Sequence, residues 1–119
     1  TAYSEFKRIA DAGKVPALDI DINGVCQLDK VLPRDKTFRL YLDVTQEEQR
    51  RRIERRGRTT DTPKIIDKRV KYALSEKIQL EQIMSVDPDM FYVKDYNSCR
   101  PQLFANELIN HLLHGVPLP

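Results

Sequence analysis

The chain has 119 residues, of which 40% are hydrophobic and 32% charged, a balance that allows one domain with a modest core. Its formal net charge of +2 excludes a polycation, so we expect no nucleic-acid partner for the chain as a whole. No apolar run approaches the roughly 18 residues that cross a bilayer, and the N-terminus does not resemble a signal peptide. Cys26 and Cys99 fit no metal spacing, and we expect reduced thiols in a cytoplasmic protein.

The first part of the chain predicts a helix, a strand and a second helix, over residues 3–12, 15–20 and 25–31. Gly13 is placed to end the first helix. The strand is expected because its run is apolar, and Pro16 is tolerable there only because it stands near the start. A turn follows at residues 33–35.

The rest of the chain predicts two further strands over residues 37–44 and 90–93, with helices over residues 45–56, 64–84 and 101–113. Thr45 is a good N-cap for the first of these helices, and Gly57 is placed to stop it. Because strands alternate with helices along the chain, the sequence predicts the α/β class with a parallel sheet.

Asp19 and Asp21 stand where the predicted strand 15–20 runs into a turn that contains Gly24. Side chains alternate across a strand, so both carboxylates are expected on one side, at the edge where open parallel sheets bind ligands. A carboxylate there can hold Mg²⁺ through water or accept hydrogen bonds from a base amide. The pattern leaves open an alternative, in which both acids cap the following helix and lie in solvent.

A cluster of arginines surrounds the expected helix 45–56, comprising Arg50, Arg51, Arg52, Arg55, Arg56 and Arg58. The helix offers too few acids to neutralise them, and the pattern fits a solvated face, a nucleic-acid contact or a clamp on a polyphosphate. Arg69 follows on the next helix. The Gly- and Thr-containing loop 57–63 between the two basic helices suits a closing lid, although a plain surface loop needs nothing different.

Taken in chain order, these segments resemble the C-terminal part of guanylate kinases. The family's L-D-I-D-x-x-G-V segment is similar to Leu18-Asp19-Ile20-Asp21-Ile22-Asn23-Gly24-Val25, and its entry into the lid is similar to Arg52-Ile53-Glu54-Arg55-Arg56-Gly57. The K-R-L motif beyond the lid resembles Lys68-Arg69-Val70, and the V-I-V-N-D strand resembles residues 91–95. The resemblance implies that residues 1–119 are the C-terminal portion of a single nucleoside-monophosphate kinase domain. Such a portion is a partial P-loop-NTPase-type parallel sheet flanked by helices, with residues 57–63 as the lid.

The resemblance also implies roles in handling phosphates. Arg52, Arg56 and Arg69 would be catalytic, because they would converge on the ATP phosphates and the transferring phosphoryl group when the lid closes. Asp19 would contact the cofactor Mg²⁺ indirectly, through water. The phosphate-cradling G-x-x-x-x-G-K-[ST] loop of the family is absent from residues 1–119 and normally lies N-terminal to them.

Roles toward the two bases follow in the same way. Asp21 would help to hold the guanine of GMP, and Thr1 falls where the family has a Ser or Thr near that ligand. Lys94 replaces the Asn that contacts adenine at the strand end, and Asn97 nearby is the candidate to substitute for it in binding ATP.

Three functions are therefore expected in order of preference. The complete domain would transfer the γ-phosphoryl group of ATP to GMP, giving ADP and GDP, while the isolated chain would be inactive. The alternative is a catalytically dead guanylate-kinase-like module that binds partner proteins in a multidomain scaffold. A related nucleoside-monophosphate kinase with another base preference is the third.

Overall fold

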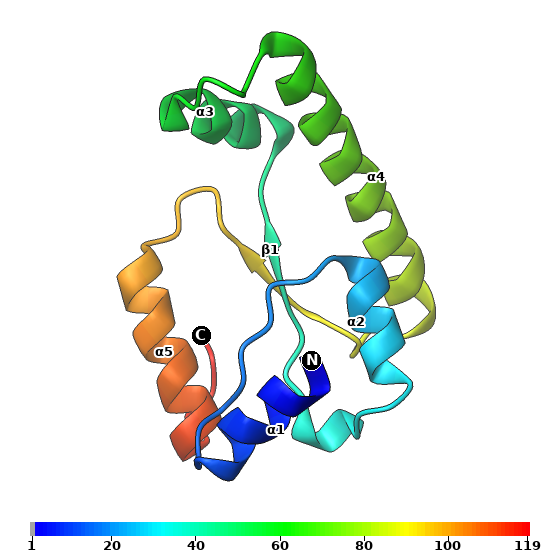
Figure 1. The fold of residues 1–119 in the computed structure, drawn as a ribbon, viewed down its shortest axis with the longest axis vertical. Helices are drawn as coiled ribbons and strands as arrows, with labels where there is room; N and C mark the ends of the chain where they lie inside the picture. The colour runs from blue at the N-terminus through cyan, green and yellow to red at the C-terminus, as the bar shows by residue number, and fades with distance from the viewer. Residues whose placement is uncertain (1) are drawn as a thin grey trace. The chain divides into compact units, whose positions relative to one another are not determined.

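The computed structural model describes residues 2–119, and the chain divides into two compact units, Thr1–Lys36 and Thr37–Pro119. The unit Thr1–Lys36 contains two helices, α1 (Ala2–Asp11) and α2 (Ile22–Asp29), and a short 3₁₀ helix, η1 (Arg34–Lys36) (Figure 1). Gly13 ends α1 as predicted, because its φ of 76° lies in the left-handed region that other residues avoid. Thr1, expected near GMP, lies outside the described residues.

The predicted strand 15–20 is wrong, because these residues have no regular structure. Val15 and Leu18 leave 58% and 54% of their surface exposed, so the apolar run is not part of a core. An apolar run indicates a strand only if another strand pairs with it, and none pairs with this one among the residues that the structure describes. Without that strand, side-chain alternation no longer places Asp19 and Asp21 on the same side.

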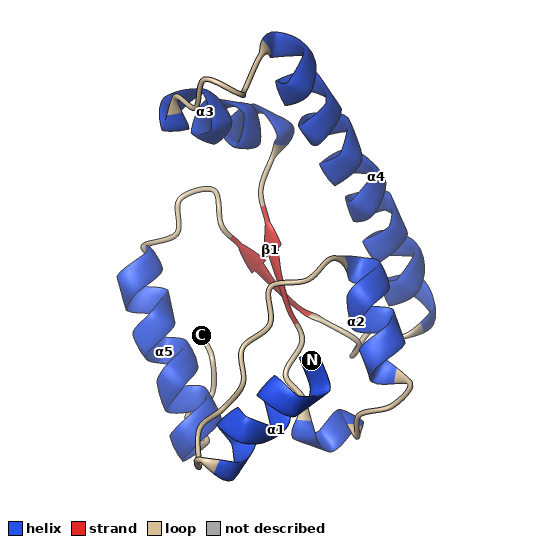
Figure 2. Ribbon diagram, in the orientation of Figure 1, coloured by secondary structure: helices blue, strands red, loops and turns tan. Residues whose placement is uncertain are grey.

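The unit Thr37–Pro119 contains the sheet, which consists of β1 (Leu40–Asp43) and β2 (Tyr92–Asp95) (Figure 2). The two strands run parallel, with Leu40 opposite Tyr92 and Asp43 opposite Asp95. Both were predicted, although β1 is shorter than 37–44 and β2 starts two residues later than 90. Met90 and Phe91 are buried but do not belong to β2. Buried residues are apolar with or without strand pairing, so these two were predicted as part of the strand.

Three helices complete this unit, namely α3 (Gln46–Arg56), α4 (Pro63–Val86) and α5 (Pro101–His114). Each agrees with its predicted range within about two residues, the usual uncertainty of helix ends. Ile53 of α3 packs with Ile66 and Val70 of α4 in one buried cluster, which holds the two helices side by side (Figure 1). The fold is thus mixed α/β with a small parallel sheet.

The longest helix, α4, has 24 residues but carries charged side chains along its whole length. Within the described residues, no helix is both long and apolar enough to cross a membrane.

Candidate oxyanion-binding groove

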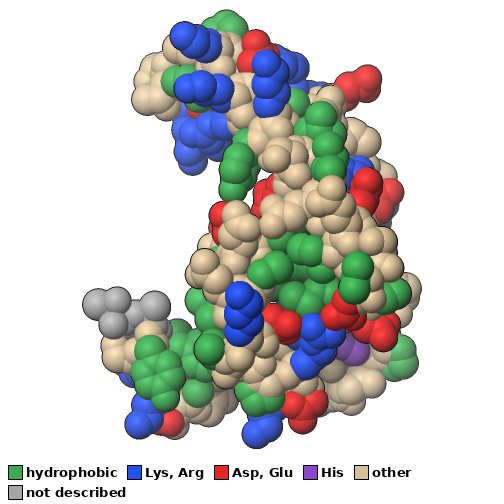
Figure 3. Space-filling view, turned by 90° about the vertical axis from the view of Figure 1, so that its right-hand side faces the viewer, with side chains coloured by type: hydrophobic (Ala, Val, Ile, Leu, Met, Phe, Trp, Pro, Cys, Tyr) green, Lys and Arg blue, Asp and Glu red, His purple; other side chains and the backbone are tan. Residues whose placement is uncertain are grey.

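An open groove of about 1210 Å³ lies between α3 and α4, next to the carboxyl end of β1. Five cationic side chains line it against two acidic ones, so the charged part of its lining is predominantly positive. The cations are Arg52, Arg56, Lys68, Arg69 and Lys77, and the acids are Glu47 and Glu76. Figure 3 shows Lys and Arg side chains gathered over α3 and the start of α4, at the top of the view. The structure therefore brings together the three arginines that were predicted to be catalytic.

Two capping residues, Thr45 and Gly57, define the ends of α3. The Thr45 hydroxyl accepts a hydrogen bond from the backbone N–H of Glu48 at 3.3 Å, and Gly57 closes the other end with a φ of 66°. Because Arg52 and Arg56 are one helical turn apart, they share the face of α3 that lines the groove.

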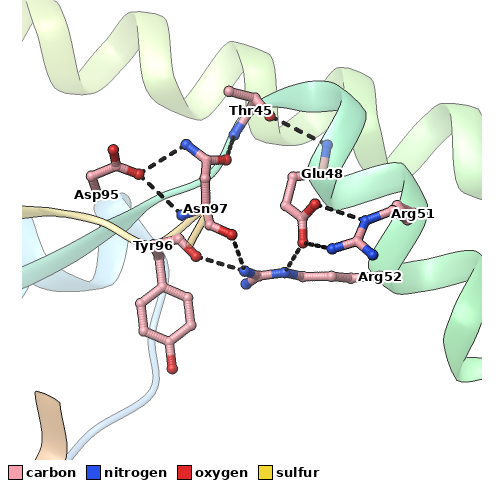
Figure 4. Close-up of polar contacts among 7 residues, drawn as sticks. All are labelled: Thr45, Glu48, Arg51, Arg52, Asp95, Tyr96 and Asn97. Carbon is pink, nitrogen blue, oxygen red and sulfur yellow. Dashed lines mark hydrogen bonds and ion pairs between the residues drawn. The ribbon is translucent and has the colours of Figure 1, made fainter. Parts of the chain in front are cut away.

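Arg52 is held by contacts that join α3 to the segment after β2 (Figure 4). Its Nε donates to Glu48 Oε1 at 2.8 Å, and its Nη2 donates to the carbonyl oxygen of Tyr96 at 2.6 Å. The guanidinium also lies over the Tyr96 ring, 5.2 Å from the centroid. Arg52 lines the groove, but its Nε and Nη2 groups donate hydrogen bonds within the protein.

Asn97, predicted to contact ATP, has a structural task at the same junction (Figure 4). Its Oδ1 accepts the backbone N–H of Thr45 at 2.9 Å, and its Nδ2 donates to Asp95 Oδ1 at 2.9 Å. Lys94 places its Nζ over the Phe104 ring, 4.9 Å from the centroid. Both residues have partners within the protein, and their predicted contact with ATP stays a prediction.

Arg56 and Arg69 face one carboxylate, Asp61, from the two helices that the loop connects. Arg56 donates through Nε and Nη2 to Asp61 Oδ2 at 3.1 and 2.8 Å, and Arg69 Nη2 lies 3.9 Å from Asp61 Oδ1. Only 3% of the Asp61 side chain is exposed. The loop thus inserts an acid between the two arginines.

As expected, the acids of α3 do not match its arginines in number. Glu48 pairs within the helix, and further counter-charges come from Asp61 and Asp67 outside it. Glu48 pairs with Arg51 at 2.7 Å, and Asp67 of α4 pairs with Arg50 at 2.6 Å. Hydrogen bonds from Arg51, and then from Arg52, lower the pKa of Glu48 from 4.5 to about 2. Within the described part of the chain, Arg55 has no ion pair.

Lys68 and Lys77 complete the basic lining from α4. Lys77 Nζ lies 3.0 Å from Asp43 Oδ1, so its charge is matched at the end of β1. Lys68 forms no ion pair with any residue that the structure describes, and it leaves one uncompensated cation in the groove.

Asp19 and Asp21 belong to the unit Thr1–Lys36 and are both exposed. Asp21 is the N-cap of α2, since its Oδ1 accepts the backbone N–H of Gly24 at 2.8 Å. A Cβ on Gly24 would stand 3.3 Å from that same oxygen, so the close cap favours glycine. Capping of α2 is the alternative that the sequence pattern had left open. The contact of Asp21 with GMP stays a prediction.

The described residues contain no group of three or more His, Cys, Asp or Glu side chains that could hold a metal ion. The predicted contact of Asp19 with Mg²⁺ runs through water and needs no such group. Both cysteines are free thiols in the structure.

Two acids that pair with the groove arginines, Glu48 and Asp61, were not among the predicted site residues. Glu48 carried a usable signal, because it stands three and four residues before Arg51 and Arg52 on one helix. Asp61 carried none, since its pairing with Arg56 and Arg69 depends on how the loop folds back between the two helices.

No protein-family model, no curated protein and no solved structure matches the chain. The resemblance to guanylate kinases is therefore carried by the sequence motifs themselves.

Proposed function

We propose that this chain is the C-terminal portion of a guanylate-kinase-like domain, and that the complete domain transfers the γ-phosphoryl group of ATP to GMP. The observation that carries the proposal is the gathering of Arg52, Arg56 and Arg69 around one groove at the carboxyl end of a parallel strand. The order of the motifs along the chain is the second support. On this proposal the two-stranded sheet is part of a larger P-loop-NTPase-type sheet.

The groove suits phosphoryl transfer because that reaction needs mainly positioning and the stabilisation of charge spread over oxygens. Guanidinium groups present paired N–H donors to such oxygens, and Arg56 and Arg69 reach one point from separate helices. Lys68 adds an unmatched positive charge in the same groove. Arg52 acts chiefly by fixing the groove wall, since its partners are Glu48 and Tyr96.

Mg²⁺ is the cofactor that this chemistry implies. A single exposed carboxylate such as Asp19 fits an indirect role, because Mg²⁺ in kinase sites keeps several of its waters. When bound, the ion neutralises developing charge on the phosphate oxygens. For GMP, an Asp21→Ala change in the complete domain is expected to weaken affinity, and an unchanged affinity would remove the residue from that role.

Binding of inorganic tripolyphosphate to the 119-residue chain, measured by calorimetry, tests the groove directly. Arg56→Gln and Arg69→Gln are each expected to weaken binding about tenfold, because each removes a charged donor. Arg55→Gln is the matched control, since Arg55 stands on the same helix outside the groove lining. Equal losses in all three variants would contradict the proposed site. With ATP and GMP, the isolated chain should release no ADP.

A protein-binding scaffold is the second candidate, and the internal pairing of Arg52 and Arg56 favours it. Helix α5 also exposes large apolar side chains, among them Leu103 and Leu113 with 53% and 60% of their surface accessible. A chain that binds no tripolyphosphate in any variant would support this scaffold and refute the kinase.

A further inference from the structure

The carboxylate of Asp61 lies between the guanidinium groups of Arg56 and Arg69. Two N–H groups of Arg56 converge on its Oδ2 at 3.1 and 2.8 Å, and such charge-assisted donors also serve phosphate oxygens. Arg69 lies beyond hydrogen-bond length, 3.9 Å from Oδ1. Both arginines line the groove.

The pairing leaves one oxygen of Asp61 unsatisfied. Only 3% of the Asp61 side chain is exposed, and its Oδ1 is inaccessible to solvent. This oxygen accepts no hydrogen bond from any described residue. A buried acceptor without a donor is costly. The carboxylate therefore accepts from Arg56 through Oδ2 alone and meets Arg69 only as an ion pair, whereas a tetrahedral oxyanion offers further oxygens to both arginines.

The loop that carries Asp61 is short and lightly held. Its backbone forms two internal hydrogen bonds, from Asp61 N–H to the Arg58 carbonyl at 3.0 Å and from Thr62 N–H to the Thr60 carbonyl at 3.1 Å. It begins at Gly57, whose left-handed backbone lets the chain turn away from α3. The loop takes no part in the buried cluster of Ile53, Ile66 and Val70, so release of Asp61 would not require that cluster to unpack.

We infer that Asp61 is an internal competitor for the oxyanion site of Arg56 and Arg69, so that a phosphate-type ligand must displace it to bind. The inference rests on the proposed function. It adds that the affinity of the groove is set by this acid as well as by the arginines. Because the negative charge of Asp61 also repels an incoming phosphate, removing it should strengthen binding rather than weaken it.

The test compares Asp61→Asn with Asp67→Asn in the full chain, with inorganic tripolyphosphate as the probe. Both variants remove one negative charge, but Asp67 is exposed and pairs with Arg50, which is not part of the groove lining. We expect Asp61→Asn to bind about tenfold more tightly than the wild type and Asp67→Asn to change affinity less than about twofold. Equal or weaker binding by Asp61→Asn, or an equal gain in Asp67→Asn, would overturn the inference.

A measurement on the wild type covers the case in which Asp61→Asn disturbs the loop. The Asp61 carboxyl carbon, followed by NMR, should shift as tripolyphosphate saturates the protein, because the carboxylate loses the Arg56 hydrogen bonds. Saturation without that shift overturns the inference and leaves the proposed function standing. No binding by the wild type or by either variant would refute both.

Discussion

Replacing Arg52 by Gln should destabilise the unit Thr37–Pro119 even in the absence of any ligand. Arg52 joins α3 to the segment after β2, through its hydrogen bond to the Tyr96 carbonyl at 2.6 Å and its position over the Tyr96 ring. Glutamine preserves helix propensity but reaches neither group with a positive charge. Glu48 keeps Arg51 as a partner in the variant, so no carboxylate is left unpaired.

The size of the loss follows from these contacts. A hydrogen bond from a charged donor contributes about 1.5–3 kcal/mol, and the partial exposure of Arg52 places it near the lower end. The cation–π contact adds about 0.5–1 kcal/mol. We therefore expect the free energy of unfolding to fall by about 2 kcal/mol, which moves a urea midpoint by about 1 M.

The assay is urea unfolding followed by circular dichroism, with Arg55→Gln as the control. Arg55 stands on the same helix and has no ion pair among the described residues, so its replacement should cost less than about 0.5 kcal/mol. Equal midpoints for the two variants would refute the structural role of Arg52. The experiment also separates stability from binding, since a ligand contact alone would leave the unliganded midpoint unchanged.

Two further predictions concern the caps and charges of α3. Gly57→Ala should lower the free energy of unfolding by about 1–2 kcal/mol, because φ is 66° and the nearest atom to an added Cβ is 3.9 Å away, so the cost is conformational; an unchanged urea midpoint would argue against it. Glu48, with its pKa lowered from 4.5 to about 2, stabilises the fold above pH 4.5, and this contribution is lost as the pH falls toward 2. The urea midpoint of Glu48→Gln should therefore fall less than that of the wild type between about pH 6 and about pH 2.5, and parallel declines would contradict this assignment.

Most helices and their ends were predictable because the signals that define them are local. The exception is α2, which begins at Ile22 instead of the predicted residue 25, so the residues predicted as a turn form its first turn. Thr45 and Gly57 were predicted to mark the two ends of α3, and they do so in the structure, because a cap depends on residues within one turn. Pro63 was predicted as the last residue of the loop 57–63, but it is the first residue of α4, where its missing N–H costs nothing. The polar loop between α3 and α4 was predictable from the same residues.

Strands were less predictable, because a strand exists only through its partner. Residues 37–44 contain β1, which pairs with β2, whereas the equally apolar run 15–20 has no partner among the described residues and remains irregular. The prediction that Asp19 and Asp21 lie on the same side of a strand is wrong for this reason. The cap formed by Asp21 survived, because capping needs only the helix that follows.

The sequence by itself determined that Arg52 and Arg56 share a helical face and that a turn separates them from Arg69. The tertiary packing of Ile53 against Ile66 and Val70 decided that the three arginines line one groove. It also decided what each arginine contacts, with Arg52 bound to Tyr96 and Arg56 to Asp61. Helical spacing fixes the direction of a side chain along its own helix, whereas its partners come from segments whose approach depends on the whole core.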